Sequence, residues 1–429
     1  MSPSKSNAFS QKARRAEDPP ISWLMRMALQ RPQLISLAAG FTDSSSLPSR
    51  EVSEIFGELA ADSRALQRAL QYGSAQGDEG LRRWTADRLA AADGLRDPGA
   101  SAHPDRVVIG NGSQQLLALA TDALCDAGDL VLIEDPTYFV YLGILQNLGI
   151  EGVPFRDVAE FRSRLAELKR DGQLSRLKLA YLVSYFRNPT GDTATFEEKK
   201  EMLAELAKAE RDAGHPIYFL EDAAYRDLRF EGGDTQSAVA ADPKLERVIY
   251  TATYTKPFAT GLKVGFGLFP DEILPVILRF KGNEDFGTSH FDQQIVARAA
   301  SSGRYEKHLE ELREVYRRKA DAMRKGLERH FPSSAKWNAP LGGLYFWVSL
   351  PESADCGVKS EIFQAAIAAD VLYVPGELCY APSPRRRVPT HQMRLSFGSA
   401  PIDQIEEGLR RLGAVLRDQL APAASSTAR

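Results

Sequence analysis

Short apolar runs alternate with amphipathic stretches between about residues 66 and 300. The apolar runs are rich in Val, Ile, Leu and Tyr and are bounded by Gly, Pro, Asn or Asp, a pattern that predicts buried strands. They are DRVVIGNG, DLVLIEDP, LKLAYLVSY, PIYFLEDAAY, RVIYTATYT and VGFGLFP. Helical patterns such as SQQLLALATDALCDAG and FEEKKEMLAELAKAERDAG lie between them, and each closes on Gly, the usual helix stop. This alternation predicts an α/β fold with a mainly parallel sheet, whose functional residues collect at the carboxyl ends of the strands.

The pattern changes after about residue 300. YEKHLEELREVYRRKADAMRKGLERHF predicts a long charged helix, and GGLYFWVSLP predicts an apolar strand behind it. A helix near 359–369, the strand QMRLSFG and a last helix in PIDQIEEGLRRLGAVLRDQ complete a smaller α+β region. A chain of 429 residues is long enough for two domains. We expect a large domain at 66–310 and a small domain formed by 20–65 and 311–429, with a functional site in the cleft between them.

Composition is that of a soluble globular protein, with 43% hydrophobic and 26% charged residues. A net charge of −3 favours neither nucleic acid nor an anionic membrane as a partner. No apolar run is long enough to span a bilayer, and the N-terminal stretch MSPSKSNAFSQKARRAEDPP lacks the apolar core of a signal peptide. We expect this stretch and the tail APAASSTAR to be disordered.

Cysteine and histidine usage bounds the chemistry further. Cys125, Cys356 and Cys379 are far apart and odd in number, which predicts neither a disulfide framework nor a zinc site. The six histidines are scattered and form no HExxH-like pair, so no metal is predicted. A reducing cytoplasm is the expected location.

Four predicted strands each end in a polar group. IGNGSQQLL opens a helix at Ser113 and Gln114, whose free N–H groups suit an anion, although a plain N-cap explains Ser113 alone. SYFRNPTGDT carries Asn188 in a turn, and FLEDAAYRDL places Asp222 at a strand end, where a capping role is the alternative. Lys256 ends the strand in YTATYTKPFATGLKVGF, where a buried ammonium is costly unless it is used or paired.

In a parallel sheet these strand ends share one edge, so the four groups are expected to lie together. A lysine amine forms a Schiff base with an aldehyde cofactor, a carboxylate pairs with a pyridinium nitrogen, and a helix start holds a phosphate. An amide and the phenol of Tyr225 suit the ring oxygen of the same cofactor. The combination predicts pyridoxal 5′-phosphate.

Seven segments in order resemble the fold-type I, class I/II aminotransferases, and most closely their kynurenine/2-aminoadipate aminotransferase-like group. The segments are LQYGSAQGDEGLRRWTADRL, GNGSQQ, EDPTYF, NPTG, DAAY, TYTK and MRLSF, and the resemblance runs from LISLAAGFTDSSSLP to the last helix. It implies a mainly parallel seven-stranded sheet in the large domain, a smaller α+β domain and a homodimer.

The resemblance implies a catalytic set and a substrate-binding set. Lys256 would hold the cofactor as a Schiff base and, once freed by substrate, move the proton between the amino-acid α-carbon and the cofactor. Asp222 would keep the pyridine nitrogen protonated. Arg394, in HQMRLSFG, would bind the substrate α-carboxylate, because a planar guanidinium matches a carboxylate. The two sets are Lys256, Asp222 and Tyr225 for catalysis, and Arg394, Asn188 and Gly40 for the substrate.

The resemblance also implies a set of cofactor-binding residues. Asn188 and Tyr225 would bond the ring oxygen, and Tyr138 would stack on the ring face, with a core tyrosine as the alternative. Tyr72 would reach the phosphate of a neighbouring subunit. The full set is Ser113, Gln114, Tyr138, Asn188, Asp222, Tyr225, Thr253, Thr255, Lys256, Lys263 and Tyr72.

Some positions depart from the family pattern. Lys263 stands where the family has an arginine and supplies charge without a fork. Phe41 and Thr42 alter a segment that commonly lines the substrate pocket. Extra basic residues, which favour an acidic substrate side chain unless they belong to a solvated loop, are Arg187, Arg385, Arg386 and Arg387.

The leading hypothesis is an aminotransferase that moves an amino group from an L-amino acid to a 2-oxo acid. The same site also suits oxidation, cyclisation, or β- or γ-replacement in a biosynthetic pathway, because the shared residues stabilise a carbanion without deciding its fate. A regulator with an aminotransferase-like effector domain is the third hypothesis. Only about 30 residues precede the matching segment, and they show no helix-turn-helix pattern.

Overall fold

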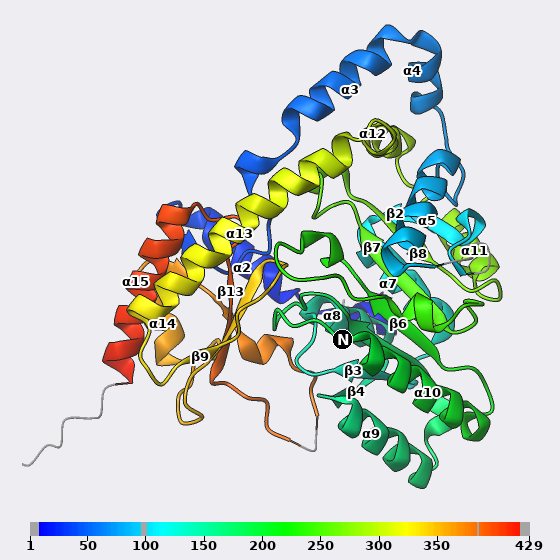
Figure 1. Ribbon diagram of the computed structural model, residues 1–429. Coiled ribbons are helices and arrows are strands. Elements are labelled where there is room, and N and C mark those ends of the chain that lie inside the picture. The colour runs from blue at the N-terminus through cyan, green and yellow to red at the C-terminus, as the bar shows by residue number, and fades with distance from the viewer. Residues whose placement is uncertain (1–7, 96–100, 384–385, 421–429) are drawn as a thin grey trace, which may run out of the picture.

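The computed structural model describes residues 8–95, 101–383 and 386–420, and its largest sheet has seven strands (Figure 1). Their spatial order is β2-β8-β7-β6-β5-β3-β4. All neighbours are parallel except β8, which runs antiparallel to β2 and β7. The strands are β2 (Val107–Asn111), β3 (Leu130–Glu134), β4 (Glu151–Phe155), β5 (Leu177–Val183), β6 (Tyr218–Asp222), β7 (Val248–Thr253) and β8 (Val264–Leu268).

Six of these strands lie in the six predicted apolar runs, and β4 is the seventh. Its sequence EGVPF is mostly half-buried and contains Pro154, so it lacks a strand signature. β4 lies at the edge of the sheet beside β3, and an edge strand tolerates a proline because one side of it donates no ladder hydrogen bonds.

Alternate residues of the strands face two separate cores. In β3, Leu130 and Leu132 belong to one apolar cluster, whereas Val131 and Ile133 belong to the other. Both clusters are buried, so both faces of the sheet are covered, which explains why its strands are nearly continuous apolar runs. The first cluster includes α5 (Glu79–Asp93), α9 (Val158–Arg170), α10 (Phe196–Ala213) and α12 (His290–Ser301), and the second includes α7 (Gly112–Leu124), α8 (Phe139–Leu148) and α11 (Leu274–Glu284).

The predicted helix stops are correct in one case and wrong in the other. α10 ends at Gly214, which adopts the left-handed conformation with φ 80°. α7 was expected to run to Gly128, but it ends at Leu124 with the extended Cys125 as its C-cap. Gly128, at φ 95°, belongs to the turn that leads into β3.

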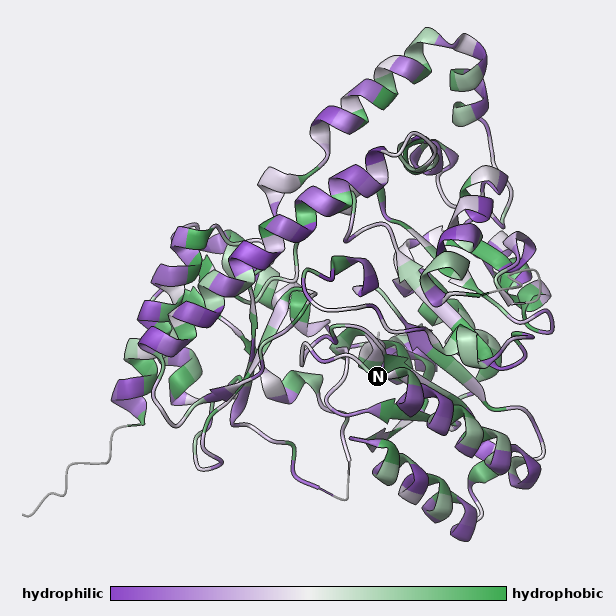
Figure 2. Cartoon of the chain, in the orientation of Figure 1, coloured by the Kyte–Doolittle hydropathy of each residue, from purple (hydrophilic) through white to green (hydrophobic). Residues whose placement is uncertain are grey.

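The long helix α13 (Arg304–His330) links this region to a second sheet, as Figure 1 shows. In Figure 2 the helix carries purple and green residues along its whole length, as expected of an amphipathic helix. The second sheet has four strands in the order β12-β13-β10-β9. Its elements are β9 (Lys336–Trp337), β10 (Tyr345–Ser349), β12 (Val374–Pro375), β13 (Gln392–Ser396), α14 (Glu361–Ala368) and α15 (Ile402–Gln419).

Residues 8–20 of the N-terminal stretch have defined structure, contrary to the expectation of disorder, and residues 1–7 lie outside the described residues. α1 (Gln11–Arg15) lies against α8, where the Arg15 guanidinium donates to the carbonyls of Asn147 and Leu148 over 3.2 Å each. A cation at those free carbonyls also complements the helix dipole. The tail APAASSTAR lies outside the described residues.

The next helices lead from the second sheet to the seven-stranded one. After α2 (Pro20–Gln30), the short strand β1 (Ile35–Ser36) pairs with β11 (Val371–Leu372). α3 (Ser49–Ala61) and α4 (Ser63–Leu70) then form an arm at the top of Figure 1. Over the described part of the chain, no helix is both long and apolar enough to cross a membrane.

Candidate active site

A cavity of about 520 Å³ lies at the carboxyl ends of β5, β6 and β7, beside the first turn of α7. The sheet topology brings these segments together although they are up to 150 residues apart in the chain. Ten of the predicted site residues line this cavity: Ser113, Gln114, Tyr138, Asn188, Asp222, Tyr225, Thr253, Thr255, Lys256 and Lys263.

Lys256 follows the end of β7, and its amine donates to the carbonyl oxygen of Gly40 over 2.6 Å. Burial lowers the pKa of Lys256 to about 8, and the nearby charges of Lys263 and Arg394 contribute to the shift. A lysine with this pKa supplies a neutral, nucleophilic amine near neutral pH.

Asp222 is the last residue of β6 and is buried. Its carboxylate accepts from the Tyr181 hydroxyl over 3.0 Å and from the Ala224 backbone N–H over 3.1 Å. Burial raises the pKa of Asp222 to about 6 against these two bonds, which favour the charged form. A buried carboxyl that titrates near neutral pH is suited to hold a proton shared with a bound base.

Arg394 does not line the cavity but lies directly beyond Asn188. Only 1% of its surface is exposed, and its guanidinium donates to Asn188 Oδ1 over 2.6 Å and to the Ala38 carbonyl over 2.7 Å. Among the described residues no carboxylate forms an ion pair with Arg394, and its Nε has no hydrogen-bond partner. A buried cation without a counter-ion is costly, so this site is built for an external anion.

Tyr345 is a site residue that the sequence did not reveal. Its hydroxyl lies 3.0 Å from that of Tyr225, and its ring lies 4.3 Å from the Arg394 guanidinium. Gly40 packs against the same tyrosine, because a Cβ at residue 40 would collide with its hydroxyl. The alternation of side chains along a strand could have pointed to it. Tyr345 lies on the same face of β10 as Trp347, and Trp347 pairs with Arg394 on β13.

The first turn of α7 forms a cradle of backbone donors. α7 begins at Gly112, whose φ of 72° lets the chain turn sharply out of β2. Gly265 permits close approach, since a Cβ there would lie 2.6 Å from the Ser113 nitrogen. The N-cap is Asn111, so the interpretation of Ser113 as a plain N-cap is wrong.

The cradle also holds a buried polar atom, Thr255 Oγ1, that has no hydrogen-bond partner among the described residues. The Thr255 nitrogen donates to Thr253 Oγ1 over 3.0 Å, and the Thr253 hydroxyl donates in turn to the Val264 carbonyl over 3.2 Å. Lys263, at φ 56°, adds an exposed ammonium at the same end of the cavity. Hydroxyls, helix N–H groups and an ammonium are the donors that a phosphate group needs.

An unpredicted carboxylate braces the cradle from outside. Asp285 accepts from Asn111 Nδ2 over 2.9 Å and from Gln115 Nε2 over 2.8 Å, on either side of Ser113. Lys281, fully buried, donates to both oxygens of Asp285. The brace joins α11 to α7, and such a pairing of distant segments has no signature in the sequence.

Tyr72 lies elsewhere on the surface of the single chain. It is 81% exposed, and its ring contacts Phe286 with centroids 5.3 Å apart. It lines a separate depression between residues 69–73 and 286–291, away from the cavity that holds Lys256.

Of the extra arginines, Arg187, Arg386 and Arg387 do not line the cavity. Arg187 pairs with the buried Glu134 over 2.9 Å, and burial raises the pKa of this glutamate to about 7 despite the arginine. Arg386 forms an ion pair with Asp135, which follows Glu134 in the chain. Arg387 is exposed, and Arg385 lies outside the described residues. Neither Arg187 nor Arg386 is left solvated and unpaired.

Comparison with known proteins agrees with this geometry. The family model for aminotransferase class I and II matches residues 32–412. The chain is 30% identical over 419 residues to aromatic-amino-acid aminotransferase 1 of Thermococcus litoralis, covering 96% of this chain and 94% of that protein. It is 30% identical to 2-aminoadipate transaminase of Thermus thermophilus, covering 97% and 98% of the two chains. The structure resembles kynurenine aminotransferase of Pyrococcus horikoshii with a TM-score of 0.86 at 29% identity, covering 97% and 98% of the chains. The chain therefore belongs to the class I and II aminotransferases, with the fold-type I architecture of that family.

Proposed function

We propose that this chain transfers the amino group of an L-amino acid to a 2-oxo acid with pyridoxal 5′-phosphate, and that Lys256 is the amine that attaches the cofactor. The observation that carries the proposal is one cavity that contains the Lys256 amine and the Asp222 carboxyl, with the unpaired Arg394 guanidinium beyond it. When bound, the cofactor supplies an aldehyde and an electron-withdrawing ring that stabilises negative charge on the substrate α-carbon.

The residues of the cavity suit this cofactor part by part. Asp222 would face the ring nitrogen as a buried carboxylate, and the Tyr225 hydroxyl and Asn188 amide would face the ring oxygen. Tyr138, which lines the same cavity, would lie against the ring face. Burial, and next the charge of Asp222, raise the pKa of Tyr138, so it stays an uncharged aromatic surface.

The phosphate would occupy the cradle at α7. Ser113, Gln114 and Thr255 would supply its donors, and Thr255 Oγ1 would gain the partner it lacks. Thr253, whose hydroxyl donates to the Val264 carbonyl, would line the phosphate site and hold the Thr255 backbone in place. Lys263 would add positive charge without the directional fork of an arginine.

Arg394 would bind the substrate α-carboxylate, with Asn188 held beside it. Gly40 places its carbonyl on the Lys256 amine and keeps the space in front of Tyr345 open. The Lys256 amine, once free, would take the α-proton of the substrate and return it at the cofactor, because it is the one base in the described cavity with a pKa of about 8.

We further propose a cytoplasmic homodimer. Tyr72 and Phe286 form an exposed aromatic pair, and Leu70 beside them is 69% exposed. Exposed apolar residues of this size, at the foot of the arm formed by α3 and α4, suit contact with a second copy. Cys125, Cys356 and Cys379 are all unpaired, which agrees with a reducing compartment.

We retain the division into a large domain at 66–310 and a small domain at 20–65 and 311–429. It is supported by the two sheets, since the seven-stranded sheet uses residues 107–268 and the four-stranded sheet uses residues 336–396. The bridging helix α13 begins at Arg304, close to the proposed boundary.

A spectral experiment tests the reaction. Amino acid added alone to the holoenzyme should convert the cofactor absorbance to that of its aminated form, and a 2-oxo acid should reverse the change. The panel should include the aromatic amino acids, kynurenine and 2-aminoadipate, because the similar proteins are named after these amino acids. Absorbance that does not convert, or conversion that consumes oxygen, would favour another carbanion reaction, and a cofactor spectrum without any turnover would favour a regulator. Lys256→Ala should abolish the conversion.

A further inference from the structure

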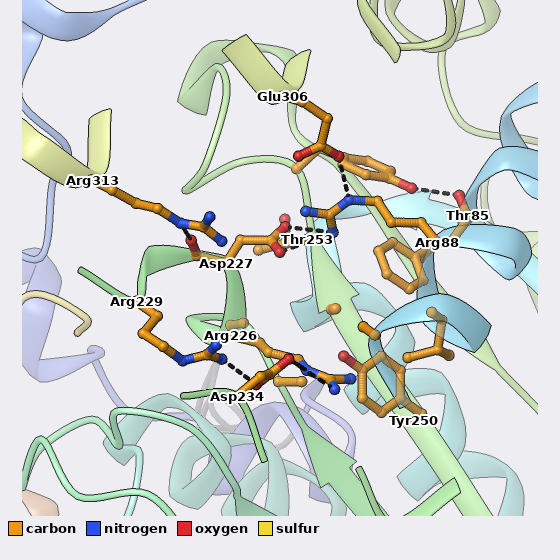
Figure 3. A pocket seen from close by; sticks show the side chains of 17 residues that line it. Thr85, Arg88, Arg226, Asp227, Arg229, Asp234, Tyr250, Thr253, Glu306 and Arg313 are labelled. Atoms are coloured by element: carbon orange, nitrogen blue, oxygen red, sulfur yellow. Dashed lines mark hydrogen bonds and ion pairs between the residues drawn. The ribbon is translucent and has the colours of Figure 1, made fainter. Parts of the chain in front are cut away.

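A second cavity, of about 210 Å³, lies next to the cofactor cavity and is drawn in Figure 3. Ala224 and Thr253 line both cavities, so the chain after β6 and the end of β7 separate them. We call it the arginine cavity. Small side chains such as Ala92, Ala223 and Ala252 leave it open, and its charged lining residues are Arg88, Arg226, Arg229, Arg313, Asp227, Asp234 and Glu306.

Each carboxylate in the arginine cavity already has a partner. Asp227 pairs with Arg88 over 2.9 Å and accepts from the Tyr305 hydroxyl over 2.9 Å. Glu306 pairs with Arg88 over 2.7 Å. Asp234 pairs with two arginines that follow β6, with Arg226 over 3.1 Å and with Arg229. None of the three carboxylates therefore needs a cation from outside.

Two guanidiniums, those of Arg313 and Arg229, keep most of their donors unused. Among the described residues Arg313 has no carboxylate partner within ion-pair distance, and its only hydrogen bond runs from Nε to the Asp227 carbonyl over 2.8 Å. Arg229 uses only Nη2, toward Asp234. A guanidinium has five N–H donors, so most of those on Arg313 and Arg229 are free. In Figure 3 Arg313 reaches in from α13, and Arg229 lies below it on the segment after β6.

The positive charge in the cavity is unevenly paired. Asp93, buried behind the lining, pairs with Arg226 over 2.6 Å, so the carboxylates gather around Arg88, Arg226 and Arg229, and Arg313 has no carboxylate partner among the described residues. Burial lowers the pKa of Arg229, and the charges of Arg226 and Arg313 lower it further against the attraction of Asp234. Like charges held together in a partly buried space are stabilised by a counter-ion.

We propose that the arginine cavity binds a small oxyanion, a carboxylate or phosphate group, between Arg229 and Arg313. Planar guanidiniums hold either group through paired N–H donors. The site is separate from the cradle at α7 and from Arg394, because Arg229 and Arg313 belong to the lining of the arginine cavity alone.

The proposed site is joined to the catalytic residues by one chain segment. Residues 222–229 run from the cofactor cavity, where Asp222 and Tyr225 lie, into the arginine cavity at Arg229. Ala224, in the shared wall, donates its backbone N–H to Asp222. An anion held by Arg229 is therefore bound to the same chain segment that positions Asp222.

Calorimetric titration with inorganic phosphate at low ionic strength tests the proposal. Every protein titrated is a holoenzyme that also carries Arg394→Gln, so that neither the cradle, filled by the cofactor, nor the substrate-carboxylate site takes up the anion. This protein without further change and with Arg317→Gln should bind with the same Kd, because Arg317 is exposed on the same helix and paired with Glu314. Arg313→Gln should bind at least about tenfold more weakly, the effect expected for a lost charge-assisted hydrogen bond. Arg313→Lys, which keeps the charge but not the fork, should be intermediate.

The same titration with acetate distinguishes a carboxylate ligand from a phosphate ligand. The anion whose affinity falls more in Arg313→Gln is the one that the site recognises. Crystals of the holoenzyme soaked in selenate should show an anomalous peak between Arg229 and Arg313. Equal affinity in all variants, an unchanged Kd in Arg313→Gln, or no saturable binding to the protein with Arg313 intact would each overturn the proposal. None of these readouts requires turnover, so they remain informative if the enzyme catalyses another reaction.

Discussion

At the scale of the residue, two cations near the Lys256 amine set its chemistry. Lys263 and Arg394 both lower the pKa of Lys256, after the larger effect of burial, and neither has a carboxylate partner among the described residues. Both cations await anions of the bound molecules, the cofactor phosphate and the substrate carboxylate. The same charges therefore serve ligand binding and keep the amine reactive before ligands arrive.

This coupling predicts how the apoprotein reacts with aldehydes. The reactive form of Lys256 is the neutral amine, so its rate of reaction should rise with pH around a midpoint near pH 8 rather than near 10.5. Pyridoxal, which lacks the phosphate, should be used so that affinity for the cradle does not enter. Lys263→Gln should move the midpoint upward because one repelling charge is removed, whereas Lys200→Gln, on the surface of α10, should leave it unchanged. A midpoint that ignores Lys263 would contradict the coupling.

Arg187 is a second departure from the family pattern with a structural cause. Its guanidinium neutralises Glu134, which also accepts from the Val183 N–H over 2.6 Å. The next residue along the chain is Asn188, which holds Arg394. The pair therefore ties the end of β3 to the end of β5 behind the substrate site.

Loss of this pair should produce a pH-dependent loss of stability. The folded-state pKa of Glu134 is raised to about 7, above the ordinary 4.5, so the stability it contributes is present below pH 4.5 and is lost as pH rises through 7. Arg187 opposes that loss. Arg187→Gln should cost about 1–3 kcal/mol of unfolding free energy at pH 8 and little at pH 5. Urea unfolding at both pH values measures the difference.

The double variant Arg187→Gln/Glu134→Gln controls for this effect. It has no titrating group at the site, so its unfolding free energy should change less between pH 5 and pH 8 than that of either wild type or Arg187→Gln. Arg164→Gln, an arginine paired with Glu160 on α9, should change stability by about 1 kcal/mol or less at either pH. If Arg187→Gln showed the same deficit at both pH values, the proposed titration of Glu134 would be wrong.

At the scale of the element, the strand ends of the site could be predicted and their supports could not. Asn188, Asp222 and Lys256 each follow an apolar run, and a parallel sheet brings such ends to one edge. Tyr345 and Asp285 come from other parts of the chain and meet the site through tertiary packing. Propensity and period describe single segments, so they predicted β5, β6 and β7 but neither the edge strand β4 nor the braces.

The contact between β8 and α7 gives a prediction at this scale. Gly265 on β8 touches the backbone of the first turn of α7, and a Cβ there would force the two apart. Gly265→Ala should therefore weaken cofactor binding about tenfold or more, because the cradle N–H groups would be misplaced. Gly143→Ala, on α8 with nothing within 4 Å of the added carbon, is the matched control and should bind normally. Fluorescence titration of the apoproteins measures both constants, and equal affinities would show that the cradle tolerates the shift.

At the scale of the whole molecule, the exposed position of Tyr72 separates two models of the active site. If Tyr72 acts in its own chain, the residues would have to rearrange, since this side chain lies with Phe286 in a depression outside the cavity of Lys256. If Tyr72 acts on a second copy, every active site combines Lys256 of one chain with Tyr72 of another. A closed dimer with twofold symmetry then contains two such shared sites.

Mixing two inactive variants decides between these models. Tyr72→Ala and Lys256→Ala homodimers each carry two damaged sites, but their hybrid has one site with both lesions and one with none. Random re-association after mild dissociation gives hybrids in about half of the dimers, so about a quarter of wild-type activity should return under the symmetric arrangement. A mixture of Lys256→Ala with Asp222→Ala is the matched control and should recover nothing, because both residues line the cavity of the same chain. No recovery in the first mixture while hybrids form would place Tyr72 in its own subunit's site, whereas recovery in the control would contradict the assignment of Lys256 and Asp222 to one chain's cavity.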